Sequence, residues 1–426
     1  MNTVTSDVGT RKNSYLLPMV IISSLFFVFG FVTWLNGILI PYLKIACQLS
    51  DFQALLVAFA FYISYTIMAL PSAWVLNRTG LKNGMMLGLW VMALGTIIFI
   101  PAAVTRTYAV FLLGLFVMGT GLALLQTASN PYVTIMGPRE SAARRISILG
   151  ICNKFAGAVA PLILAYYILS DGDAFVASLA NMGEAEQTAA LDQLARRVIN
   201  PYIVMTIILF ILGGIVRLSG LPDLEMESEE DAELNSNSVK RNIFSYPHLI
   251  LGVVTLFFYV GVEVIAGDTI IRYGLSLGIE LSTAKAFTSY VMATMVIGYI
   301  IGIFMIPKYM SQRFALQISA ISGLIFAIGA IFTSGFTSVV FVALFGLSNA
   351  LVWPAVWPLA LHNLGKHIKI GSAMLIMAIS GGAIIPLIWG SLSDSIGSQN
   401  AYWVAVPCYL VILFYAVKGY KLKSWR

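Results

Sequence analysis

Charged side chains are scarce in this sequence: Asp, Glu, Lys and Arg make up 10% of its 426 residues, and only three histidines occur. The three cysteines, Cys47, Cys152 and Cys408, are far apart and form neither a CxxC pair nor metal-ligand spacing. This argues against a disulfide framework and a cysteine metal site. The absence of a GxxxxGK[ST] string excludes a P-loop. With no nucleophile-and-base constellation either, we predict no catalytic residue, no bound metal, no cofactor and no enzymatic activity.

Apolar residues are correspondingly abundant. They form 59% of the chain, and the mean hydropathy is +0.88, more than one globular core could bury. Apolar stretches long enough to cross a bilayer recur along the chain. They cover residues 16–43, 52–76, 83–103, 108–136, 146–169, 201–219, 248–271, 284–306, 315–333, 336–361, 370–391 and 401–417. We therefore predict an all-α integral membrane protein with twelve transmembrane helices.

The basic residues are distributed unevenly among the connecting segments. With twelve spans, the two tails and every second loop lie on the same side of the membrane. These segments hold 18 of the 25 Lys and Arg, and the loops on the other side hold six. The remaining one, Lys154, lies within a span. Since basic loops stay in the cytoplasm, both termini are expected there. This asymmetry accounts for most of the net charge of +6, so nucleic acid is not an expected partner.

The chain divides into two similar halves. "LFFVFG" (25–30) matches "LFFYVG" (256–261) at an offset of 231, and "AVAPLI" (158–163) matches "AIIPLI" (383–388) at 225. We predict two six-helix bundles related by a pseudo-twofold axis along the membrane normal, as in alternating-access transporters. The expected segments are a cytoplasmic tail (1–15), an N-terminal bundle (16–219), an acidic cytoplasmic linker (220–247), a C-terminal bundle (248–417) and a cytoplasmic tail (418–426).

Polar side chains within the spans are the candidate site residues, because each is costly in hydrocarbon without a partner. Amides and carboxylates suit the hydroxyls of a sugar, and an indole can cover its apolar face. The substrate-binding candidates are Asn36, Gln126, Asn130, Asn153, Glu263 and Trp353. Two of them have an alternative interpretation: Asn130 precedes Pro131 and fits a simple helix break, and Trp353 fits packing at a kink equally well.

The intramembrane charges are candidates for ion coupling: Glu263, Asp268 and Lys154. On a straight helix the two acids point about 140° apart, so they cannot face one point together. Lys154 is the only cation deep in a span and could pair with either acid. We expect Glu263 to bind the coupling ion or a sugar hydroxyl, and Asp268 to support it or to pair with Lys154.

Several strings resemble one known family. "WLNGILIP", "LQTASNPYVTIMGP", "NKFAGAVAPL", "YVGVEVIAGDTIIRYG" and "LHNLGKHIKIGSAMLIMAISGGAIIPLI" resemble the fucose/galactose/glucose group of the major facilitator superfamily, with the bacterial N-acetylglucosamine permeases the most similar subgroup. Proton-coupled fucose symporters of this family carry essential carboxylates where this chain has Gly37 and Gln126. In the internal repeat, Gly37 of the first span corresponds to Asp268, 231 positions later in the seventh span. We therefore expect that the carboxylate missing from the first span has its counterpart at Asp268.

The resemblance implies a cation-coupled monosaccharide symporter, with the proton favoured and sodium as the alternative. The imported sugar would be glucose, galactose or N-acetylglucosamine. It further implies a monomer in the bacterial inner membrane, whose partners are the sugar and the lipid bilayer. The alternatives are a small-molecule efflux antiporter, whose cavity should be more apolar, and a sugar-sensing receptor, which should carry a signalling domain.

Overall fold

The structure is a computed structural model of the whole chain, and it describes residues 16–135, 142–221, 243–306, 309–362, 364 and 368–425. Every regular element in these ranges is a helix, as predicted. The N-terminal half contains α1 (Leu16–Trp34), α2 (Asn36–Ala46), α3 (Asp51–Thr105), α4 (Tyr108–Ile135), α5 (Ala142–Ile168), α6 (Gly172–Leu179), α7 (Glu184–Arg196) and α8 (Ile199–Leu218).

The C-terminal half begins with a 3-10 turn, η2 (Ile243–Ser245). Its helices are α10 (Pro247–Asp268), α11 (Ile270–Ser276), α12 (Leu281–Ala284), α13 (Phe287–Met305), α14 (Gln312–Phe332), α15 (Gly335–Asn349), α16 (Val352–Ala360), α17 (Ile368–Met377), η4 (Ala378–Ser380), α18 (Gly381–Ile396), η5 (Asn400–Val404), α19 (Ala405–Val417) and η6 (Gly419–Lys421).

Twelve stretches of the described chain are long and apolar enough to cross a membrane, which confirms the predicted number. The second and third spans run together as α3, and the change of direction between them falls at Gly80, with φ 75° and ψ 170°. Glycine adopts this backbone conformation without a steric penalty. Two other spans are interrupted by a single residue, the first at Leu35 between α1 and α2 and the seventh at Thr269 between α10 and α11.

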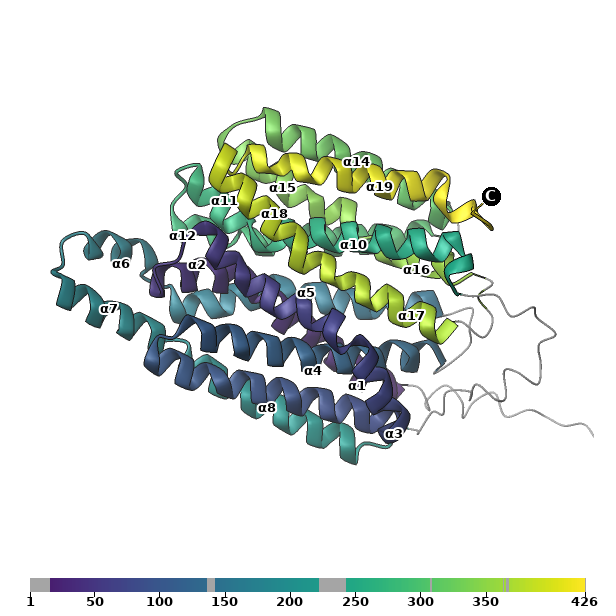
Figure 1. Cartoon of the computed structure of the whole chain (residues 1–426), viewed down its shortest axis with the longest axis horizontal. Helices are drawn as coiled ribbons and strands as arrows, with labels where there is room; N and C mark the ends of the chain where they lie inside the picture. Colours follow the sequence, from purple (N-terminus) through teal and green to yellow (C-terminus); the bar gives the residue numbers. More distant parts are fainter. Residues whose placement is uncertain are drawn as a thin grey trace, which may run out of the picture.

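Each half is held together by the same kind of helix pair. In the N-terminal half α1 packs on α5, and in the C-terminal half α10 packs on α18 (Figure 1). Glycine permits the close approach in both: a Cβ on Gly30 would lie 1.8 Å from the carbonyl oxygen of Asn153, and one on Gly381 would lie 1.8 Å from that of Phe257. The first and fifth spans of one half thus correspond to the seventh and eleventh spans of the other, as the sequence repeat predicts.

The halves meet along two interfaces, α3 against α18 and α5 against α13. The second is tied by the hydroxyl of Ser289, which donates to the carbonyl oxygen of Ala158 at 2.5 Å. A further connection lies beyond the spans, where both carboxylate oxygens of Asp173 accept backbone N–H bonds, from Leu281 and Ser282 at 2.8 Å each. The α6–α12 end of the bundle is therefore closed by contacts between the halves.

Two connecting segments differ from the expectation of simple loops. Residues 170–200 contain α6 and α7, which extend beyond the bundle at one end (Figure 1). The C-terminal tail folds back on the second half, since the indole of Trp425 donates to the carbonyl oxygen of Phe244 at 2.7 Å. The predicted N-terminal tail and residues 222–242 of the predicted linker lie outside the described residues.

Candidate functional site

An ion pair joins the two halves deep in the bundle. Lys154 of α5 donates from its Nζ to Oε1 of Glu263, on α10, at 2.5 Å, and each side chain is 10% exposed. Of the two acids expected as partners for Lys154, the structure selects Glu263; the expected alternative pair with Asp268 is not formed. A buried charge pair of this kind is favourable only when both members are present, because either charge alone would be left uncompensated.

Trp34 completes the surroundings of the lysine. The Nζ of Lys154 lies 4.5 Å from the centre of the Trp34 ring, a distance at which the cation is attracted to the ring face. A Cβ on Gly157 would lie 2.4 Å from this ring and one on Gly267 would lie 2.3 Å from it. The glycines of α5 and α10 therefore make the slot that the indole occupies between the halves.

Asp268 is buried more completely than Glu263 and has a different environment. Its residue is 0% exposed, and neither carboxylate oxygen has a hydrogen-bond partner among the residues that the structure describes. It is the last residue of α10, next to the interruption at Thr269. The carboxyl groups of Asp268 and Glu263 lie close enough to interact, and no hydrogen bond from the described residues reaches Asp268, so its supporting role stays a prediction.

The predicted amides lie on spans of the N-terminal half, and hydrogen bonds within the protein use only part of their donor and acceptor capacity. Gln126 donates to the hydroxyl of Tyr65 at 2.9 Å, and Asn153 donates to the carbonyl oxygen of Phe26 at 3.3 Å. Asn36 is 1% exposed, and neither atom of its amide has a partner within the described ranges. Asn130 is half-buried near the end of α4.

Trp353 lies in the C-terminal half as part of an aromatic group. Its ring stacks on Trp357, with centroids 5.2 Å apart and planes inclined by 27°, and lies 6.4 Å from Tyr259. Both tryptophans are half-buried, so packing accounts for one face of Trp353 without covering the whole side chain.

A group of tyrosines surrounds the ion pair, and sequence reasoning missed Tyr259, Tyr299 and Tyr409 among them. Four hydroxyls from four spans lie close enough to Glu263 to interact with its charge, namely those of Tyr62, Tyr259, Tyr299 and Tyr409. Tyr259 could have been found, because it precedes Glu263 by one turn on the same helix face. Tyr299 gives no local signal, since it reaches the site by packing against Gly150 of another span.

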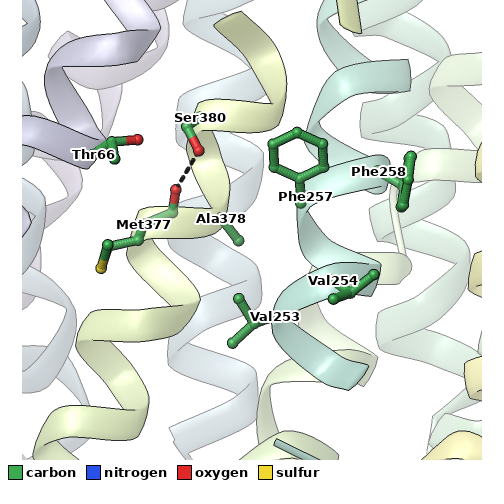
Figure 2. Close-up of a pocket in the computed structure, with 8 residues that line it drawn as sticks. All are labelled: Thr66, Val253, Val254, Phe257, Phe258, Met377, Ala378 and Ser380. Carbon is green, nitrogen blue, oxygen red and sulfur yellow. Dashed lines mark hydrogen bonds between the residues drawn. The ribbon is translucent and has the colours of Figure 1, made fainter. Parts of the chain in front are cut away.

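A separate pocket lies between the halves, lined by Thr66 of α3 together with residues of α10 and the α17–η4 segment (Figure 2). Its lining is almost entirely apolar, and the hydroxyl of Ser380 is turned to the carbonyl oxygen of Met377 at 2.7 Å. None of the predicted site residues lines it. We therefore place the candidate site at the Lys154–Glu263 pair and not in this pocket.

This arrangement of two repeated six-span bundles with polar groups between them coincides with a known family. The model of the Major Facilitator Superfamily matches residues 22–382. The chain belongs to the major facilitator superfamily. This is a family of transporters, which confirms the prediction of a multi-pass membrane transporter rather than an enzyme.

Relatives within this superfamily match nearly the whole chain. A glucose/galactose transporter of Brucella abortus (strain 2308) is 35% identical over 99% of this chain and 98% of its own length. A putative glucose/galactose transporter of Helicobacter pylori (strain J99 / ATCC 700824) is 30% identical over 96% and 98%. The L-fucose-proton symporter of Escherichia coli (strain K12) is 30% identical over 97% and 95%. The resemblance to the fucose/galactose/glucose group is thereby confirmed.

The structural comparison agrees. A crystal structure of the E. coli fucose:proton symporter matches with a TM-score of 0.72 and 27% identity, covering 95% of this chain and 98% of that one. A D-xylose-proton symporter matches with a TM-score of 0.69 at 16% identity, which supports the fold alone.

Proposed function

We propose that this superfamily member imports a monosaccharide by cation-coupled symport, with the proton as the coupling ion and sodium as the alternative. The observation that carries the proposal is the buried Lys154–Glu263 pair, which connects the two halves where a transporter must open and close. The names of the relatives, glucose/galactose transporters and a fucose-proton symporter, favour the same function.

The predicted amides of the N-terminal half, together with Glu263, suit a polyhydroxylated ligand. Gln126 and Asn153 each donate one hydrogen bond inside the protein and have an amide oxygen that accepts none from the described residues. An amide oxygen can accept from a sugar hydroxyl, and a carboxylate oxygen of Glu263 can do the same. We propose that these three residues bind the sugar, with Asn36 and Asn130 at its edge and the free face of Trp353 against its C–H face.

The proposed substrate is glucose, galactose or N-acetylglucosamine. These sugars differ by one epimeric hydroxyl or one acetamido group, so a few side chains at the edge of the site decide among them. We propose further that the chain acts as a monomer in the bacterial inner membrane with both termini in the cytoplasm. One chain supplies both halves of the site, which is consistent with a monomer.

Uptake of labelled sugar tests this proposal. The chain is expressed in bacterial cells that lack their own uptake of glucose, galactose and N-acetylglucosamine, and uptake of each labelled sugar is measured alone and against an excess of each unlabelled sugar. We expect accumulation above the level of empty-vector cells and competition by at least one of the three substrates. Absence of uptake for all three labelled sugars, with the protein present in the membrane, would refute the proposed function.

A further inference from the structure

Asp268 has features that the sugar site does not explain. It is 0% exposed, and in the described part of the chain both of its carboxylate oxygens lack a hydrogen-bond donor. An ionised carboxylate in such a place loses its hydration without compensation, which is among the most costly arrangements in a protein interior. This site therefore favours a carboxyl group that carries a bound proton whenever the bundle is closed around it.

The nearby cations are engaged by other groups. Lys154 is held by Glu263 at 2.5 Å. Arg272, one turn beyond Asp268, donates to the hydroxyl of Ser393 at 2.8 Å, lies 3.6 Å from Asp394 and is stacked over Trp389 at 4.8 Å. Neither cation therefore neutralises Asp268 in this conformation.

The other groups that face Asp268 are an acid and a phenol. Glu263 lies on the same helix and its charge opposes a second negative charge at Asp268. Tyr62 comes from α3 of the opposite half, and its buried hydroxyl has no partner among the described residues. A protonated Asp268 could donate to such a hydroxyl, whereas an ionised one would depend on it as a donor.

The position of Asp268 in the fold is also unusual. It borders the interruption of the seventh span at Thr269, and the first span is interrupted at Leu35. The two interruptions lie against each other, because a Cβ on Gly37 would lie 3.1 Å from the carbonyl oxygen of Gly267. Interrupted helices at the interface of two repeats are where transporters hold their ions and substrates.

We propose that Asp268 is the residue that carries the coupling proton, while Glu263 stays paired with Lys154 and binds the sugar. When the site opens to the outside, a proton from water forms an O–H bond with the Asp268 carboxylate. The neutral side chain can then be enclosed as the halves close over the sugar. When the site opens to the cytoplasm, the O–H bond breaks, the proton passes to water, and the carboxylate is hydrated until the cycle restarts.

The inference rests on the proposed function, and Asp268→Asn separates the two. The asparagine keeps the size of the side chain but cannot take up and release a proton. When sugar is added to de-energised cells, we expect the parent to draw protons from the medium and Asp268→Asn to show no such alkalinisation. In energised cells, we expect the parent to accumulate sugar and Asp268→Asn to fail to do so. Counterflow of labelled against unlabelled sugar, which needs no net proton movement, should remain within about threefold of the parent. The matched control is Asp192→Asn, which should behave as the parent: Asp192 of α7 is half-buried and pairs with Arg106 at 3.3 Å.

Each outcome distinguishes the claims. If the parent neither accumulates nor exchanges sugar, the proposed function fails. If the parent transports sugar and Asp268→Asn still accumulates it with proton uptake, the proton carrier is not Asp268. If Asp268→Asn loses counterflow as well although it is folded and present in the membrane, Asp268 serves sugar binding or the conformational change, and the assignment is again overturned.

Discussion

Lys154 and Glu263 are 109 positions apart in the sequence and belong to different halves, yet their charged atoms lie 2.5 Å apart. The pair is the charged connection between α5 and α10 on which the proposed site is built. In the proposed alternating-access cycle one half moves against the other, so a cross-half pair of this kind would contribute to the energy difference between the closed and open states.

Removing one member of the pair should destabilise the protein more than removing both. Lys154→Met leaves Glu263 buried without a partner, and the loss for such a change is about 3–5 kcal/mol. The double variant Lys154→Met with Glu263→Gln leaves no uncompensated charge and should recover much of this loss. Thermal unfolding of the purified variants in detergent measures the difference. Additive losses in the double variant would show that the two side chains do not interact.

Gln126→Ala should weaken sugar binding. Losing the amide should raise the dissociation constant about 5- to 150-fold, since it removes a hydrogen bond worth ~1–3 kcal/mol. Tyr65→Phe is the control, because it removes only the hydroxyl to which Gln126 donates at 2.9 Å. Equilibrium binding of labelled sugar to membranes reports both. Unchanged affinity in Gln126→Ala would show that Gln126 does not bind the sugar.

Asp173 should hold the halves together at the α6–α12 end. Asp173→Ala removes the acceptor of two backbone N–H bonds from Leu281 and Ser282, so the closed state should become less populated. A cysteine introduced at Ser289, buried at the α5–α13 interface, should then react faster with a hydrophilic maleimide. Asp192→Ala, in the neighbouring α7, is the control. Equal labelling rates in both backgrounds would show that Asp173 does not stabilise closure.

The reactivity of Cys47 should depend on pH. Burial raises the pKa of its thiol to about 11. The thiolate is the reactive form, so alkylation at neutral pH should be slow and should accelerate as the pH rises toward that value. Iodoacetamide labelling of a variant that keeps Cys47 alone, with Cys152 and Cys408 replaced by alanine, measures this. A rate that levels off near pH 9 would contradict the raised pKa.

The orientation can be tested in a background in which Cys47, Cys152 and Cys408 are all replaced by alanine. A cysteine placed in the predicted 220–247 linker should be protected in intact spheroplasts, and one in α7 should be labelled by an impermeant maleimide. Labelling of the linker from outside would reverse the orientation derived from the distribution of Lys and Arg.

The number of spans and the two-half architecture could be predicted because they depend on hydropathy and on internal repeats, both of which are local patterns. The helices α6 and α7 were not predicted, because long-range contacts hold them in place: Asp173 of α6 accepts from the backbone of Leu281 in the second half, whereas α7 packs on α2 and α3 of its own half. The sequence also could not decide which acid Lys154 pairs with, because that depends on how α5 crosses α10. Tyr299 was missed for the same reason: it approaches Glu263 from a separate span.

The most direct test of cation-coupled sugar import uses purified protein in proteoliposomes under an imposed ion gradient. We predict that an inward proton gradient drives labelled glucose or galactose above its external concentration, and that a protonophore abolishes this accumulation. An inward sodium gradient at equal pH should give equilibration only. Accumulation under the sodium gradient alone would show that sodium, and not the proton, is the coupling ion. Equilibration without accumulation under every gradient would contradict symport altogether.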